Sequence, residues 1–133
     1  MTDEIHSFSF PKKEKLTHKK IIGRLFEEGK FVKSYPFKII YLPNESETHQ
    51  VAFAVPKRNI KLAVDRNKIK RRLREAYRLN KHLLYNSGNS TKLAMVVLYH
   101  GKDIPNYHEI ASKLVQLLNE IVAKTNQNNK NGG

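Results

Sequence analysis

The stretch "DRNKIKRRLREAYR", residues 65–78, concentrates cationic side chains in a short segment. From Lys57 to His82 the chain has eleven Lys or Arg and two acidic residues, which supplies +9 of its net charge of +13. Arg presents a planar fork of hydrogen-bond donors and Lys a point charge, and both suit phosphate oxygens. Release of condensed counterions would supply much of the affinity for a polyanion. The segment therefore predicts a surface for the phosphates of RNA, DNA or an anionic membrane.

A charge run can also be no more than a solvated helix face, and this alternative stays open. Lys70, Arg74 and Arg78 are i,i+4 neighbours on a helix, where like charges repel by about 0.2–0.5 kcal/mol per pair. A purely structural helix would place acidic residues between them. Asn67 can exchange hydrogen bonds with a base or a ribose 2′-hydroxyl, and it is equally well explained as a residue near a helix start.

No residue pattern predicts a catalytic centre on this chain. The twelve acidic residues are scattered, whereas a protein nuclease needs metal-binding carboxylates or a general base. No two of the six His lie at i,i+4 on one predicted helix, so no zinc pair is indicated. Phosphate-loop and dinucleotide-binding glycine patterns are missing. We therefore expect no catalytic residue and no metal ligand on the protein itself.

Composition narrows the class of protein further. The 133 residues suffice for one domain, and the absence of Cys excludes disulfides and thiolate metal sites. No apolar run reaches the about 18 residues of a membrane span, and the N-terminus does not read as a secretory signal. We expect a cytoplasmic protein with an N-terminal segment at 1–11 that can be flexible, one domain at 12–124 and a disordered polar tail at 125–133.

Hydrophobic periodicity and turn residues predict six elements: a helix over 17–29, strands over 35–42 and 50–57, a helix over about 65–83, a strand over 92–100 and a helix over 106–124. Thr17 is expected to cap the first helix and Gly29 to end it. The first two strands are expected to form an antiparallel hairpin. Asn106 with Glu109 resembles a capping box. The order indicates an α+β sandwich, with helices packed on a small mixed sheet.

The basic segment has two distinct faces when drawn as a helix that turns by about 100° per residue. One face is apolar and is expected to pack on the sheet; it holds Ile69, Leu73, Ala76, Tyr77 and Leu84. The adjacent face is a polar stripe that holds Asn67, Lys70, Arg71, Arg74, Arg78 and Lys81. The helix is thus expected to be anchored by one face and to display cations on the next.

At these residues the sequence resembles a known family. The stretch "AVDRNKIKRRLREAYR" is similar to the signature of the bacterial ribonuclease P protein component, whose core is Arg-Asn-x-x-Lys-Arg-x-x-Arg. Upstream, "KLTHKKIIGRLFEEGK", "PFKIIYL" and "FAVPKR" match in the family's order. The resemblance covers roughly residues 12–120.

The resemblance implies a two-layer αβββαβα sandwich with an additional short strand near 31–34 and a left-handed βαβ crossover. It implies that the catalyst is an RNA subunit, with Mg²⁺ held mainly by that RNA and the substrate. The protein would bind the catalytic RNA and the single-stranded 5′ leader of precursor tRNA, and would assist removal of the leader. Neither a protein partner nor a membrane is required.

The resemblance and the polar stripe together define the expected site. The RNA-binding residues are Lys57, Arg58, Arg66, Asn67, Lys68, Lys70, Arg71, Arg74 and Arg78. The leader cleft would be lined by Ile22, Phe26, Lys38, Ile40 and Phe53. Ile22 and Ile40 stand where many members carry aromatic residues, which leaves the strength of leader stacking open, since one stacked base contributes about 1–3 kcal/mol. Lys38 could compensate through phosphate contacts, and Phe26 is equally well explained as a core residue.

Two alternatives remain at this stage. The first is a general RNA-binding module, ribosomal or chaperone-like, that uses the same basic helix without a role in cleavage. The second is a metal-dependent nuclease in its own right, against which the scattered carboxylates argue. A cleft for single-stranded leader beside the basic helix separates the family function from the first alternative.

Overall fold

The computed structural model describes residues 10–88 and 90–132, with side chains up to residue 126. A short 3₁₀ helix, η1, precedes the regular elements. In chain order the elements are η1 (Lys12–Glu14), α2 (Lys19–Glu28), β1 (Lys30–Ser34), β2 (Phe37–Asn44), β3 (Gln50–Ala54), α3 (Ala63–Asn80), α4 (His82–Tyr85), β4 (Lys92–Tyr99) and α5 (Tyr107–Gly132). This is the αβββαβα order that the resemblance implies, with the additional strand present as β1.

The four strands form one mixed sheet in the order β1-β2-β4-β3. β2 pairs antiparallel with β1 and β4, and β3 pairs parallel with β4. The predicted antiparallel hairpin between β2 and β3 is therefore wrong. β4 lies between them because every residue from Leu93 to Tyr99 is buried, and such a strand loses the most free energy at an exposed edge.

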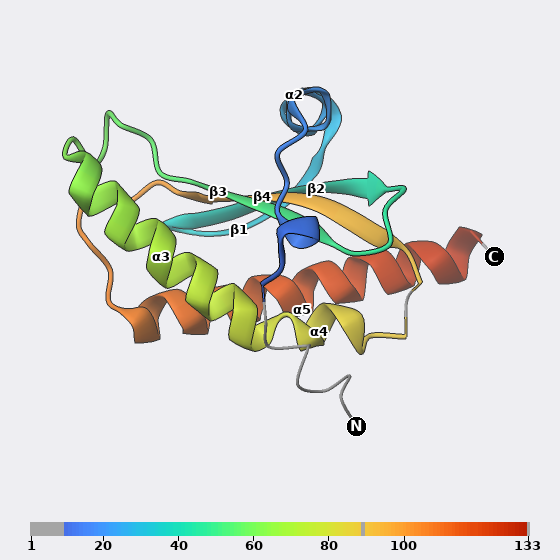
Figure 1. Ribbon diagram of the computed structural model, residues 1–133. Coiled ribbons are helices and arrows are strands. Elements are labelled where there is room, and N and C mark those ends of the chain that lie inside the picture. Colours follow the sequence, from blue (N-terminus) through green and yellow to red (C-terminus); the bar gives the residue numbers. More distant parts are fainter. Residues whose placement is uncertain (1–9, 89, 133) are drawn as a thin grey trace.

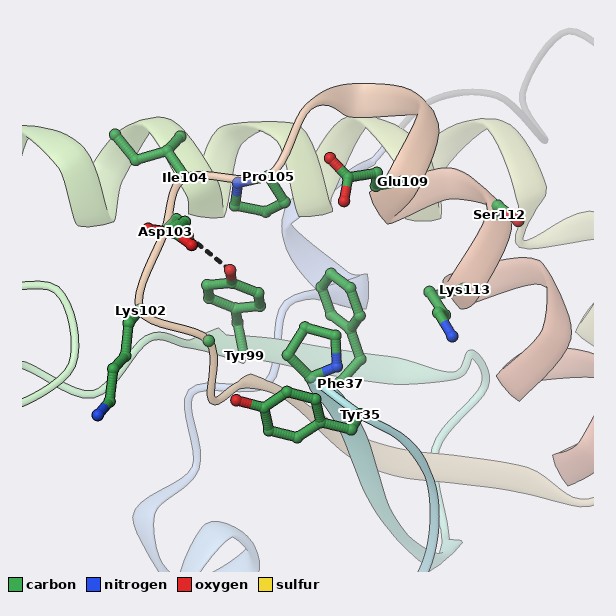
Figure 2. Close-up of a pocket in the computed structure, with 12 residues that line it drawn as sticks. Tyr35, Phe37, Tyr99, Lys102, Asp103, Ile104, Pro105, Glu109, Ser112 and Lys113 are labelled. Atoms are coloured by element: carbon green, nitrogen blue, oxygen red, sulfur yellow. Dashed lines mark hydrogen bonds between the residues drawn. The ribbon is translucent and has the colours of Figure 1, made fainter.

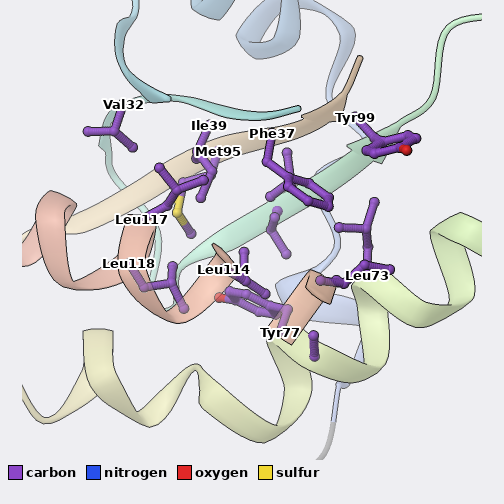
Figure 3. Packing of buried hydrophobic residues seen from close by; sticks show 14 of the residues in the cluster. Val32, Phe37, Ile39, Leu73, Tyr77, Met95, Tyr99, Leu114, Leu117 and Leu118 are labelled. Carbon is purple, nitrogen blue, oxygen red and sulfur yellow. The ribbon is translucent and has the colours of Figure 1, made fainter. Parts of the chain in front are cut away.

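Helices cover the two faces of the sheet unequally (Figure 1). α3, α4 and α5 lie together on one face, and α2 crosses the other. Side chains of β4 alternate between the two sides, so Met95 and Val97 join the larger core while Val96 and Leu98 join a smaller core under α2. Figure 3 shows the larger core, where Leu73 and Tyr77 of α3 pack with residues of the sheet and α5.

Gly29 ends α2, as predicted, and the structure explains why a glycine stands there. A Cβ atom at this position would lie 2.4 Å from the carbonyl oxygen of Leu25 and 2.6 Å from a methyl carbon of Ile40. The chain therefore turns from helix to sheet where no side chain fits. The predicted cap at the other end is wrong, because the N-cap residue is His18 rather than Thr17 and makes no capping side-chain hydrogen bond.

The capping box at the start of α5 is confirmed. The Glu109 amide donates to Asn106 Oδ1 at 2.9 Å, and the Asn106 amide donates to Glu109 Oε1 at 3.3 Å. α5 runs on to Gly132, so residues 125–132 continue this helix where a disordered tail was expected. The Thr125 hydroxyl donates to the carbonyl oxygens of Ile121 and Val122, which supports the helix past its predicted end at Lys124.

The chain reaches α2 through an N-terminal strap, residues 10–16, that crosses the edge of the sheet at β3 (Figure 1). The Leu16 amide donates to the Val51 carbonyl oxygen at 3.0 Å, and the Phe10 ring packs against the larger core. Residues 1–9 of the segment predicted to be flexible lie outside the described residues. No described helix has both the length and the apolar character that a membrane span requires.

Candidate nucleic-acid interface

The basic helix is anchored as its periodicity predicts. Ile69, Leu73, Ala76 and Tyr77 are fully buried between the sheet and α5. Leu84, the fifth residue of the predicted face, is also buried but belongs to α4, because the helix is interrupted after Asn80. These contacts hold α3 rigidly, so the cations on its free side have defined positions.

Exposed cations follow one side of α3 and the turn before it. Lys57, Arg58, Arg71 and Arg74 are exposed, together with Asn67, while Lys68 and Lys70 are half-buried. Within the part of the chain that the structure describes, no salt bridge is formed by Lys57, Arg58, Lys68, Lys70, Arg71 or Arg74. Positive charge without carboxylate partners on a rigid surface attracts a polyanion.

The predicted stripe ends at Arg78, because its last member lies inside the protein. Lys81 is only 1% exposed, and its Nζ lies 2.7 Å from Oε1 of Glu14 in η1. The prediction that Lys81 is displayed with the other cations is therefore wrong: η1 packs over this end of the helix and supplies the partner. Arg78 remains half-exposed but is bound through two nitrogens to Glu75, which lowers the pKa of that carboxyl.

Two further arginines of the segment hold the backbone of loops. Arg66 Nη1 donates to the carbonyl oxygens of Ile60 and Lys61, at 2.9 and 2.8 Å. Arg72 Nη1 donates to the carbonyl oxygen of Pro105 at 2.7 Å. Arg66 thus fixes the loop that follows Lys57 and Arg58. The sequence analysis predicted an RNA contact for Arg66 but not this structural role.

Four of the five predicted cleft residues lie on the α2 side of the sheet. Ile40 is buried under α2 with Leu25, and Ile22 is half-buried beside them. Phe26 is 56% exposed, which excludes the alternative that it is a core residue. Lys38 is half-buried on the same face of β2 as Ile40.

Phe53 is not on that face. Along β3, Ala52 and Ala54 pack with the smaller core under α2, whereas Phe53 packs with the larger core. Its ring lies edge-on to the rings of Phe10 and Tyr77, at centroid distances of 6.1 Å in both cases. The structure therefore separates Phe53 from the other four residues by the thickness of the sheet.

Phe31 belongs to the α2 side and was missed by the sequence analysis. It is 47% exposed on β1, and Nζ of Lys38 lies 4.5 Å from the centroid of its ring. An exposed aromatic ring beside a cation is suited to stacking on a base whose phosphate meets the cation. The available signal was the strand that the resemblance implies near 31–34, because neighbouring side chains of a strand point to opposite faces and Phe31 therefore lies opposite the buried Val32.

His100 lies where the α2 side approaches the turn before α3. Burial lowers the pKa of His100, and the charges of Lys38 and Arg58 lower it further. Its backbone amide donates to the Pro36 carbonyl oxygen at 2.8 Å, and its carbonyl oxygen accepts from Asn59 Nδ2 at 3.0 Å. Lys38 and His100 line one small hollow, and Asn59, the neighbour of Arg58, binds the His100 carbonyl oxygen, so the two cationic surfaces approach each other here.

A hollow of about 540 Å³ lies away from the predicted site residues (Figure 2). It opens between the turn after β1, the end of β4 and the start of α5, with the rings of Tyr35, Phe37 and Tyr99 in its wall. Asp103 and Glu109 border it together with Lys102 and Lys113. This mixture of charges does not favour phosphate. Among the described residues, no group of three or more His, Asp or Glu could hold a metal ion.

Comparison with known proteins finds relatives over most of this chain. The model of the Ribonuclease P family matches residues 10–122. The Ribonuclease P protein component of Chlorobium phaeobacteroides is 31% identical over 88% of this chain and 90% of its own length. That of Citrifermentans bemidjiense is 32% identical over 89% of this chain and 97% of its own length.

Solved structures share the fold. The RNase P protein of Thermotoga maritima superposes with a TM-score of 0.67 at 24% identity, covering 80% of this chain and 96% of that protein. The RNase P protein of Staphylococcus aureus gives a TM-score of 0.66 at 22% identity over 80% of this chain and 94% of that protein. Taken with the match to residues 10–122 and the curated relatives, these likenesses establish that this chain belongs to the Ribonuclease P protein family.

Proposed function

We propose that this chain is the RNA-binding protein subunit of ribonuclease P, which removes the 5′ leader of precursor tRNA. The observation that carries the proposal is the row of cations on the anchored helix α3 and the turn before it, where Lys57, Arg58, Lys70, Arg71 and Arg74 form no salt bridge among the described residues. Repulsion between these side chains costs folding free energy, which phosphates would recover on binding. The catalytic RNA is the partner of this surface.

The second part of the proposal assigns the 5′ leader to the α2 side of the sheet. Phe26 and Phe31 offer exposed rings there, and Lys38 lies beside one of them. Ile22 provides half-buried apolar surface rather than a further ring, and Ile40 is buried beneath α2. Two rings and a cation suit a short single strand bound with little base selectivity.

In this proposal the protein does not carry the catalytic centre. Cleavage takes place at the RNA subunit, with Mg²⁺ bound mainly by RNA phosphates and substrate. The protein positions the leader and lowers the Mg²⁺ concentration that the RNA requires. It acts in the cytoplasm and needs no further protein partner.

The test combines the purified protein with a bacterial ribonuclease P RNA and a precursor tRNA at low Mg²⁺, where the RNA alone is slow. The expected result is cleavage at the mature 5′ end that appears only when both components are present. If the protein binds the RNA without stimulating cleavage, the basic surface is a general RNA-binding surface and the competing hypothesis of a ribosomal or chaperone-like module is correct. Cleavage by the protein alone with Mg²⁺ would instead identify a protein nuclease.

A further inference from the structure

A second hollow, of about 280 Å³, lies at the β3 edge of the sheet, between the N-terminal strap, β3 and α3. Its wall combines the rings of Phe10 and Phe53 with the side chains of Lys15, Lys70 and Arg74. Its volume is at the lower end of the range of ligand pockets, which begins at about 300 Å³, so it could hold at most one nucleotide. We call it the strap hollow.

The aromatic part of the strap hollow is held in place by Tyr77. The rings of Phe10, Phe53 and Tyr77 lie edge-on to one another, with centroid distances between 5.8 and 6.1 Å. Tyr77 is fully buried, whereas Phe10 and Phe53 are half-buried and reach the hollow. Two half-exposed rings backed by a third give a rigid apolar wall, which suits the flat face of a base.

The charged part of the hollow comes from two elements that are remote in sequence. Lys15 belongs to the strap, and its Nζ lies 5.9 Å from the centroid of the Phe10 ring. Lys70 and Arg74 are one helical turn apart on α3 and face the strap across the hollow. Neither carboxylate that flanks this region is free to neutralise them, since Glu14 is bound to Lys81 and Glu75 to Arg78. Three cations around one small hollow favour a phosphate group.

We infer that the strap hollow binds one unpaired nucleotide of RNA, with its base against Phe10 and Phe53 and its phosphate between Lys15, Lys70 and Arg74. This inference rests on the proposed function, since it names a separate contact for the RNA that α3 binds. It assigns a role to the strap, which lies outside the basic helix. The nucleotide comes either from the catalytic RNA or from the leader, and the experiment distinguishes the two.

The first experiment uses a tryptophan as a reporter, because the chain contains none. Phe53→Trp places one in the strap hollow, and Phe26→Trp places one on the α2 surface as the matched comparison. Each variant is titrated with octauridylate, with the catalytic RNA, and with precursor tRNA carrying or lacking its leader. Quenching of the Phe53→Trp signal by the catalytic RNA assigns the nucleotide to that RNA. Quenching that requires the leader assigns it to the substrate, and no quenching by any of these RNAs refutes the inference.

The second experiment tests the charge without altering the core. Lys15→Gln and Lys12→Gln remove the same charge from the same strap, but only Lys15 lines the hollow. Lys15→Gln is expected to weaken binding of the quenching RNA about fivefold more than Lys12→Gln and to reduce the salt slope by about one. Equal losses of affinity in the two variants would overturn the inference. If Phe53→Trp does not fold, as judged by the lack of a cooperative unfolding transition, the comparison of Lys15→Gln with Lys12→Gln tests the inference by itself. The proposed function fails separately, when the wild-type protein does not stimulate cleavage.

Discussion

The buried ion pair between Lys81 and Glu14 offers a quantitative test of how the strap is held. Nζ of Lys81 lies 2.7 Å from Oε1 of Glu14, and the two side chains are 1% and 8% exposed. At an effective dielectric constant of about 20, unit charges at this separation attract by about 6 kcal/mol. Burial of the two charges costs a comparable free energy. The intact pair therefore contributes little net stability, whereas one charge left alone is expensive.

Lys81→Met is expected to lower the free energy of unfolding by about 3–5 kcal/mol, because Glu14 would lose its partner while still buried. For a domain of this size, that corresponds to a fall in Tm of about 10–20 °C. The double variant Lys81→Met with Glu14→Leu is expected to recover most of the loss. Urea unfolding of the four proteins of this cycle measures the coupling between the two residues. A single variant that costs less than about 1 kcal/mol would refute the reasoning, since it would mean that Glu14 reaches water.

Arg71→Ala combined with Arg74→Ala should weaken affinity for the catalytic RNA and lower its salt slope by about two, while thermal unfolding stays unchanged, because both side chains are exposed; unchanged affinity at moderate salt would remove α3 from the interface. Phe26→Ala should weaken binding of leader-bearing substrate by about 1–3 kcal/mol with little change in Tm, because the ring is 56% exposed; a large fall in Tm without a leader effect would contradict its assignment. Burial, and to a lesser extent the charge of Lys92, lowers the pKa of His49 from 6.5 to about 4. The neutral ring therefore contributes its full stabilisation above pH 6.5, and the free energy of unfolding falls by about 3 kcal/mol as the pH is lowered to 4. Urea unfolding between pH 6.5 and 4 should show this loss in the wild type. In His49→Gln the free energy of unfolding should fall less steeply with pH, because only Asp and Glu side chains still titrate; equal slopes in the two proteins would show that His49 does not titrate there.

The basic helix could be predicted in detail because its information is local. Residues three or four positions apart share a face in any helix, so the order of residues already separated Ile69 and Leu73 from Arg71 and Arg74. The capping box at Asn106 and Glu109 is local in the same sense, since both hydrogen bonds join residues three apart. These two local predictions were confirmed, whereas the local prediction that Thr17 caps α2 was wrong.

Three of the predictions that failed depend on contacts between distant segments. The strands β2 and β3 are adjacent in sequence, and only the burial of β4 on both faces places it between them. Phe53 was assigned to the α2 side without knowledge of which face each β3 residue occupies. Lys81 has the helical position of an exposed cation, and its burial follows from a strap residue 67 positions away.

The sequence alone was sufficient to predict the density of positive charge, the amphipathic basic helix, the order of elements and the resemblance to the family. Composition and periodicity are properties of the order of residues and do not depend on how the chain folds. Only the tertiary structure decided which cations face solvent, which arginine holds a loop, and which aromatic rings meet which charges. Those outcomes depend on where Glu14, Phe10 and the carbonyl oxygen of Ile60 lie in space. Packing brings such partners together across the chain, and periodicity along one element carries no information about them.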